Sequence, residues 1–141
     1  GGGDWAADRI MPDLIRSLAS NDVIKVRSPN SNRPWQHVLE PLSGYLLLAE
    51  RLSLESSLYD STSFNLFATA FNFGPKVESN RSVQELVKHS LSIWPGDWKD
   101  TSAINSLHEA QRLHLQIDKA YHQLGWEPRW SFGFKRWEVR K

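Results

Sequence analysis

The sequence predicts a mixed fragment of α-helices and a few short β-strands, of the α+β or α/β class. Its 141 residues, 40% of them hydrophobic, suffice for one domain with one core, which we expect to span residues 1–141. Apolar residues recur at helical spacing in several stretches, whereas the strand-like runs are short. Because these elements do not make complete βαβ units, we expect an incomplete domain that cannot form a parallel sheet from this chain alone.

The first half of the chain predicts two helices and one strand. Apolar residues on one face indicate a helix over residues 10–20, with Pro12 in its first turn, where a missing N–H does no harm. A β-branched run at 23–27 indicates a strand. A second helix is entered through Pro41 and contains Gly44, which costs about 1 kcal/mol relative to alanine. We therefore expect a close packing contact at that glycine.

Turn-forming residues dominate the connections. The segments SPNSNRP (28–34) and WPGDWKDTS (94–102) are predicted to be a polar loop and a turn. The apolar segment AFNF (70–73) ends at a Gly-Pro step, which is typical of a buried strand that meets a turn.

The second half predicts two more helices. A capping box from Ser82 to Glu85 opens one that extends to about residue 93. The stretch 107–117 fits either a strand or an extended loop. Asp118 is then expected to cap a short helix that Gly125 ends.

Composition excludes several classes of protein. With 17 Lys+Arg against 16 Asp+Glu, the net charge of +1 argues against a protein that coats nucleic acid. The absence of cysteine excludes disulfides and thiolate metal sites. No apolar run approaches the roughly 18 residues that span a bilayer, and the start does not resemble a signal peptide. We therefore expect a cytoplasmic, soluble protein without a membrane partner.

The polar cluster RPWQH offers the first candidate binding group. Arg33 stands on a rigid X-Pro step, from which its guanidinium could clamp a phosphate or carboxylate, and Trp35 could stack on a base or sugar. The pattern alone favours a surface arginine beside a core tryptophan. Asp8 and Arg9, before the first helix, could contact a ligand or satisfy the free N–H groups of the helix. Asn72 could face a ligand or cap its turn.

The sequence carries no recognisable catalytic or cofactor apparatus of its own. Its five histidines lack metal-binding spacing, and we predict no metal site. There is no G-x-S-x-G elbow, no glycine-rich dinucleotide fingerprint and no Tyr-x-x-x-Lys pair. We name no catalytic residue.

Four stretches, in this order and spacing, resemble one family: GGGDWAADRIMPDLIRSL, VRSPNSNRPWQHVLEPLSGYLLLAERL, FNFGP, and HEA followed by DKAYHQLGWEPRW. They are similar to the carboxy-terminal part of the CDP-glucose 4,6-dehydratases, extended short-chain dehydrogenases/reductases that act on nucleotide sugars. The resemblance covers nearly the whole chain and is most specific in RPWQHVLEPLSGYL. It implies the substrate-binding part of an extended Rossmann-type enzyme, without the dinucleotide-binding domain that would precede residue 1.

The resemblance implies a lyase of deoxysugar biosynthesis, as used for lipopolysaccharide O-antigen. Such an enzyme oxidises CDP-glucose with tightly held NAD, eliminates water and returns the hydride, which gives CDP-4-keto-6-deoxyglucose. The catalytic and NAD-binding groups would all lie before Gly1, so we expect this chain alone to bind no cofactor and to be inactive.

The resemblance also implies which residues hold the nucleotide sugar. Arg33 matches the arginine that neutralises the diphosphate, and Trp35 stands beside it. The remaining candidates are Asp8, Arg9 and Pro12 along the nucleotide, Asn72 and His108 near the diphosphate or nucleoside, and Gly3, Asp4 and Trp5 at the sugar pocket.

Other functions remain open from the sequence. Seven tryptophans would also suit a stand-alone module that binds carbohydrate or protein, and an inactive gene remnant is a third alternative. Loss of an upstream domain would expose an apolar face, so we expect a homo-oligomer that shields Ile10 and Leu14.

Overall fold

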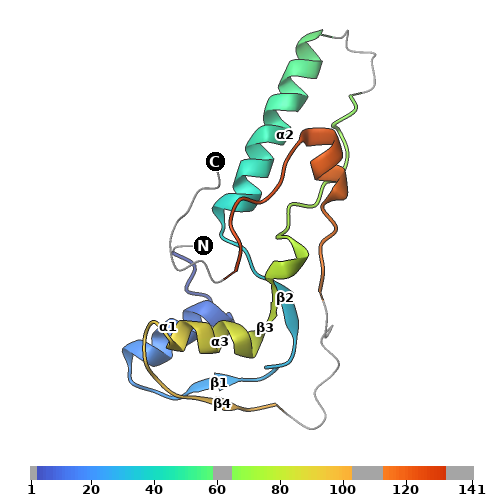
Figure 1. The fold of residues 1–141 in the computed structure, drawn as a ribbon. Coiled ribbons are helices and arrows are strands. Elements are labelled where there is room, and N and C mark those ends of the chain that lie inside the picture. The colour runs from blue at the N-terminus through green and yellow to red at the C-terminus, as the bar shows by residue number, and fades with distance from the viewer. Residues whose placement is uncertain (1–2, 59–64, 103–112, 133–141) are drawn as a thin grey trace. The chain divides into compact units, whose positions relative to one another are not determined.

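A computed structural model describes residues 3–58, 65–102 and 113–132 (Figure 1). The chain divides into two compact units, each built from two separate stretches. Unit 1 comprises Gly1–Pro34 and Asn80–His114, and unit 2 comprises Trp35–Ser79 and Leu115–Lys141. The single-domain organisation over residues 1–141 stays a prediction.

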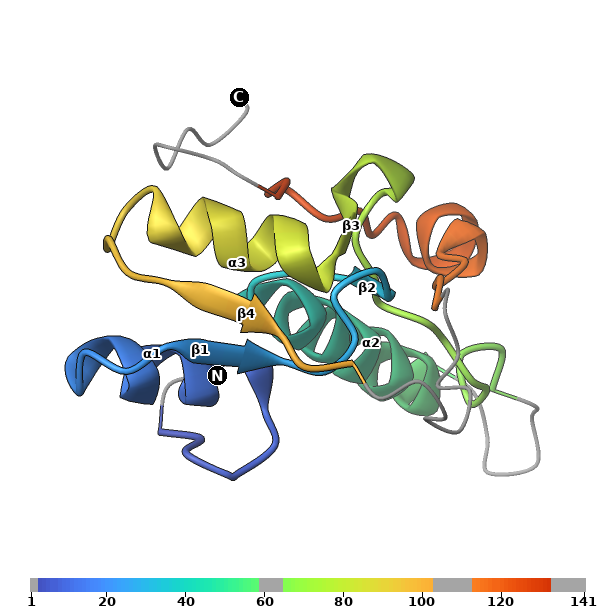
Figure 2. The ribbon, with the colours of Figure 1, turned by 90° about the horizontal axis from the view of Figure 1, so that it is seen from below.

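Unit 1 contains two helices and two pairs of very short strands. Its elements are α1 (Ile10–Ala19), β1 (Ile24–Val26), β2 (Asn32–Pro34), β3 (Asn80–Ser82), α3 (Val83–Leu91) and β4 (Trp98–Asp100). Strand β1 pairs with β4 in parallel, with Lys25 opposite Lys99, and β2 pairs with β3 antiparallel, with Arg33 opposite Arg81. Figures 1 and 2 show β1 and β4 side by side in both views.

The parallel pair corrects our expectation that this chain alone could form no parallel sheet. Strands β2 and β4 also lie in segments that we expected to be a polar loop and a turn. Both errors have one cause. A three-residue strand is too short to show alternation, and its partner strand is distant in the sequence, so no local window reveals the pairing.

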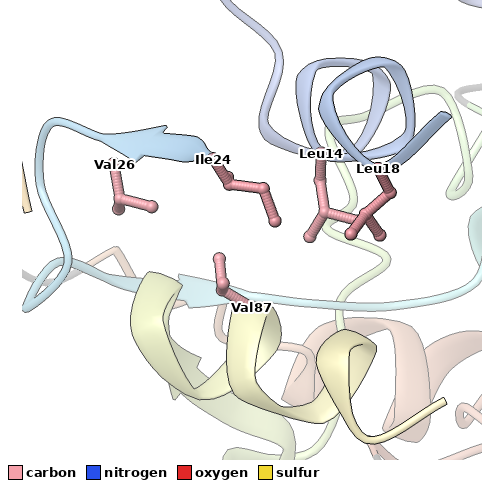
Figure 3. Close-up of a cluster of buried hydrophobic side chains, with 5 residues drawn as sticks. All are labelled: Leu14, Leu18, Ile24, Val26 and Val87. Carbon is pink, nitrogen blue, oxygen red and sulfur yellow. The ribbon is translucent and has the colours of Figure 1, made fainter. Parts of the chain in front are cut away.

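The core of unit 1 lies between α1, β1 and α3. Its buried members are Leu14, Leu18, Ile24, Val26 and Val87 (Figure 3). Along β1, Ile24 and Val26 are buried while Lys25 between them is exposed, because successive side chains of a strand point to opposite faces. Glycine 96 allows Leu18 to approach closely, since a Cβ there would overlap its side chain.

This core corrects the face that we expected self-association to shield. Leu14 is only 2% exposed and packs within unit 1, and Ile10 is partly buried against the same cluster. Exposed apolar side chains lie elsewhere in unit 1, for example Met11 and Ile93, and on α2 (Leu39–Leu58) of unit 2, where they include Leu39, Leu42 and Leu46. Oligomerisation itself stays a prediction.

Two predicted helix signals are confirmed. Pro12 lies in the first turn of α1. At α3, the Ser82 hydroxyl accepts a hydrogen bond from the Glu85 backbone, and the Glu85 carboxylate accepts one from the Ser82 backbone, which is the expected capping box.

Unit 2 is built on α2, with the 3₁₀-helix η1 (Val77–Ser79) and the π-helix η2 (Ala120–Leu124). Its core consists of Phe73, Ala120, Leu124 and Trp126. Gly44 of α2 lies against the Phe73 ring, so the predicted close contact at this glycine is confirmed.

Two smaller predictions for unit 2 are corrected. Residues 70–73 form no assigned strand, although Phe73 is buried as expected. Asp118 does not cap its helix. Its carboxylate accepts a hydrogen bond from the Gln116 side chain instead. Gly125 does end that helix, with φ +69°, in the left-handed conformation that favours glycine.

Side chains of α2 and η1 hold the segment that follows η2. The carboxylate of Glu40, only 3% exposed, accepts hydrogen bonds from the backbone N–H groups of Arg129 and Trp130. The buried Ser79 hydroxyl accepts one from the backbone of Phe132. None of the helices within the described residues is long and apolar enough to cross a membrane.

Candidate functional site

The loop before α1 carries the three residues predicted at the sugar pocket, Gly3, Asp4 and Trp5. Gly3 adopts φ +86°, a conformation that favours glycine, and a Cβ there would meet no neighbour within 4 Å. Asp4 accepts a hydrogen bond from the backbone N–H of Ala6 at 3.1 Å, which forms an Asx turn. The side chain of Trp5 is 58% exposed and thus available for stacking.

Arg16 fixes this loop to α1. Its guanidinium donates to the carbonyl oxygen of Trp5 at 2.7 Å and to that of Ala6 at 3.5 Å, and it forms an ion pair with Asp13 one turn earlier. The backbone around Trp5 is therefore held by a side chain of the helix that follows.

Asp8 and Arg9 are the two residues that immediately precede α1. Asp8 adopts φ +63° and its carboxylate accepts from the guanidinium of Arg27, just after β1, at 2.9 Å. Arg9 is the N-cap residue of α1, but no side chain caps the first N–H groups. Pro12, in the first turn, is half-buried.

A cleft of about 610 Å³ opens in unit 1, beside α1 and the β1–β4 pair. Among the predicted site residues that the structure describes, only Asp8 lines it. Sequence reasoning missed the four basic residues described in its lining, Arg16, Lys25, Arg27 and Lys99. The signal was available for Lys25, because alternation along the predicted strand at 23–27 places it opposite the apolar face.

Arg33 lies on β2, half-buried, and donates to the carbonyl oxygen of Asn32 at 3.0 Å. Directly opposite on β3 is Arg81, which sequence reasoning also missed. It donates to the carbonyl of its own preceding residue at 3.0 Å and approaches Glu85 at 3.7 Å. Residues directly opposite in an antiparallel pair place their side chains on the same face, so unit 1 presents two guanidinium groups on one face of β2–β3.

The remaining candidates belong to unit 2 or lie outside the described residues. Trp35 is half-buried, and Asn72 is exposed and donates to the backbone carbonyl of Gln116 at 3.3 Å. Of the two roles we left open for Asn72, this hydrogen bond is a structural one. His108 lies outside the described residues.

Within unit 1 the structure thus brings together the loop, α1 and β1, with Asp8 joined to Arg27 and Trp5 to Arg16. The predicted site residues of unit 1 are Gly3, Asp4, Trp5, Asp8, Arg9, Pro12 and Arg33. Over residues 3–58, 65–102 and 113–132, no group of three or more side chains could hold a metal ion.

Two carboxyl groups of unit 1 have perturbed acidity. Hydrogen bonds from the backbone and hydroxyl of Ser82 lower the pKa of Glu85. Those from the hydroxyl and backbone of Ser102 lower the pKa of Asp100, on the exposed β4 strand. Both shifts arise from local caps and turns and mark no acid–base pair.

Comparison with known proteins supports the resemblance. No model of a protein family matches the sequence. The chain is 45% identical over 133 residues to CDP-glucose 4,6-dehydratase of Salmonella typhimurium. This match covers 93% of the chain, which spans only 34% of the length of that enzyme.

Solved structures share the fold at much lower identity. An epimerase from the methanogen Methanothermobacter thermautotrophicus superposes with a TM-score of 0.68 at 18% identity, over 91% of this chain and 34% of that protein. UDP-glucuronic acid 4-epimerase from Bacillus cereus, solved with UDP-glucuronic acid and NAD, gives 0.64 at 16% identity, over 88% and 36%. The predicted fold class, helices with short strands like part of an extended Rossmann-type enzyme, is therefore confirmed, and the sequence is related to a segment of CDP-glucose 4,6-dehydratase.

Proposed function

We propose that this chain is the carboxy-terminal, substrate-binding part of a cytoplasmic, NAD-dependent CDP-glucose 4,6-dehydratase of deoxysugar biosynthesis. The observation that carries the proposal is the 45% identity over 133 residues. In this proposal the chain holds CDP-glucose, and the groups that oxidise the sugar and eliminate water belong to the remainder of the enzyme. The chain alone would then be inactive.

The β2–β3 pair supports a diphosphate-binding role for Arg33. Two like charges directly opposite in a sheet repel one another, and an anion between them would relieve that repulsion. Guanidinium groups bind phosphate oxygens bidentately, which suits the diphosphate of a nucleotide sugar. We assign the sugar end of the ligand to the Gly3–Trp5 loop, and the nucleoside to Asp8, Arg9 and Pro12. Trp35, Asn72 and His108 are further proposed contacts.

We infer that the glycines described by the structure do not hold NAD, which is bound at a glycine-rich turn between a strand and a helix. Among the described glycines, Gly44, Gly74 and Gly96 pack against side chains, and Gly125 ends a helix. Gly3 belongs to the loop before α1, where the proposal places the sugar end of the ligand. We therefore assign NAD binding to the remainder of the enzyme.

Isothermal titration of the 141-residue chain with CDP-glucose, CDP and glucose tests this proposal. We expect CDP-glucose and CDP to bind, glucose alone not to bind, and Arg33→Ala to lose at least about tenfold in affinity for CDP. Arg51→Ala, an exposed arginine of α2, is the matched control and should bind like wild type. Equal affinity for glucose with and without the nucleotide would instead identify a carbohydrate-binding module, and an unchanged affinity in Arg33→Ala would remove the assigned diphosphate contact.

A further inference from the structure

The face of the β1–β4 pair opposite the core is open and basic. Ile24 and Val26 point from β1 toward Val87 of α3 (Figure 3). Lys25 between them is exposed, so by strand alternation it projects from the other face. The parallel register sets Lys25 opposite Lys99, and side chains at matched positions of neighbouring strands share a face. Two exposed ammonium groups therefore stand on neighbouring strands.

These two charges are uncompensated. Neither ammonium group makes a hydrogen bond or ion pair within the part of the chain that the structure describes. Arg27, two positions after Lys25, lines the same cleft. Its ion pair with Asp8 involves side chains that are 68% and 76% exposed, and exposed pairs of this kind are weak enough to rearrange around a ligand.

The acidic residues of the cleft do not cancel this charge. Asp13 is paired with Arg16, and Asp8 is paired with Arg27. Among the lining residues that the structure describes, Asp22 then carries the one remaining negative charge, against the two positive charges of Lys25 and Lys99. The cleft thus has four basic and three acidic side chains. Hydroxyl groups of Ser17 and Thr101 also line it and can donate to an oxyanion.

The size of the cleft indicates a ligand larger than a free ion. Its volume of about 610 Å³ lies within the range of roughly 300–1,000 Å³ that holds small organic ligands. Arg33, the proposed diphosphate contact, does not line it.

We propose that this cleft is a second ligand site of unit 1, in which Lys25 and Lys99 together bind the phosphoryl group of a small phosphorylated molecule. Arg27 joins them when the ligand displaces its exposed contact with Asp8, so that three basic side chains then face the two carboxylates of Asp8 and Asp22. The site is independent of the contact proposed for Arg33, so either can fail alone.

Titration of the Arg33→Ala variant with inorganic pyrophosphate tests the site. This background is used because it removes the other proposed phosphate contact. In that background we expect saturable binding, which the further pair Lys25→Gln and Lys99→Gln weakens at least about tenfold. Lys88→Gln, at an exposed lysine of α3, removes one positive charge outside the cleft and should leave the affinity unchanged. Loss of all binding in Arg33→Ala, or equal affinity in the double-lysine and Lys88 variants, would overturn the proposal.

Two further measurements complete the test. Asp22→Asn removes the unpaired acid of the cleft, and we expect tighter pyrophosphate binding. A weaker or equal affinity would contradict the site. Pyrophosphate that still binds at saturating CDP-glucose supports a second site for a different phosphorylated ligand. Displacement of pyrophosphate by CDP-glucose in a manner that depends on Lys25 and Lys99 would make the cleft part of the nucleotide-sugar site and would overturn the proposal. Circular dichroism melts verify that all variants fold, as the exposed positions of Asp22, Lys25, Lys88 and Lys99 predict and as the half-buried position of Arg33 requires to be checked.

Discussion

Gly44 of α2 packs directly under the ring of Phe73, and an added Cβ would lie only 2.7 Å from the ring Cγ. Since both residues are buried in unit 2, neither can move aside without disturbing the ring contacts of Phe73, which meets Trp126 edge-on at 5.0 Å between centroids. The packing against Phe73 therefore requires glycine at this position, despite the low helix propensity of glycine.

We expect Gly44→Ala to lower the free energy of unfolding by about 1–3 kcal/mol, although alanine is the better helix former. Urea unfolding measures the loss. A double-mutant cycle with Phe73→Leu is the control: the smaller side chain makes room for the Cβ, so the second substitution should be less harmful in that background. Additive losses would show that the two residues do not interact.

The buried carboxylate of Glu40 gives the second prediction. It accepts the N–H groups of Arg129 at 3.0 Å and Trp130 at 2.7 Å, and alanine would leave both without their acceptor. We expect Glu40→Ala to lower the free energy of unfolding by about 1–3 kcal/mol and Glu40→Gln, which retains an acceptor oxygen, by less. Chemical denaturation compares them with Glu50→Ala, an exposed position of the same helix. Equal stability of the alanine and glutamine variants would contradict this role.

The capping box of α3 predicts a pH dependence. Hydrogen bonds from Ser82 hold the folded pKa of Glu85 below its ordinary value of 4.5. Folding is therefore favoured by the ionised carboxylate above that value, and this contribution is lost as the pH falls through the lower, folded pKa. In thermal melts we expect Glu85→Gln to melt below wild type at pH 7, with the difference shrinking toward pH 3. A difference that is constant with pH would exclude the ionised carboxylate as its cause, and Glu50→Gln is the matched control.

Features that depend on neighbouring residues were predictable from the sequence. The Ser82–Glu85 capping box, the first-turn Pro12 and the helix-ending Gly125 each follow from local backbone chemistry, and each is confirmed. Gly44 belongs with them, because a glycine inside a helix already indicates a close neighbour, although only the fold identifies that neighbour as Phe73.

The candidate site was less predictable because its geometry depends on pairing between distant segments. Arg33 could be singled out by its proline neighbour, but Arg81 becomes relevant only through the β2–β3 register. Lys99 likewise joins Lys25 only because β4 pairs with β1. Each of these strands has three residues, too few for the alternation that reveals a buried face.

The final prediction concerns Asp8, whose φ of +63° and ion pair with Arg27 could each explain its presence before α1. The left-handed conformation costs most side chains about 1–2 kcal/mol, whereas glycine, asparagine and aspartate tolerate it. We therefore expect Asp8→Ala to destabilise the chain by about that amount, and Asp8→Asn and Asp8→Gly to remain close to wild type.

The ion pair predicts a different pattern. Removing only the charge, in Asp8→Asn or Arg27→Ala, should lower the unfolding free energy by no more than about 1 kcal/mol, and high salt should erase the effect. Urea unfolding of the four variants at low and high salt separates the two causes. If Asp8→Asn lowered the unfolding free energy as much as Asp8→Ala, and only at low salt, the ion pair and not the backbone conformation would explain the aspartate at this position. We expect only Asp8→Ala to lower the unfolding free energy clearly at both low and high salt, because the cost of a positive φ does not depend on ionic strength.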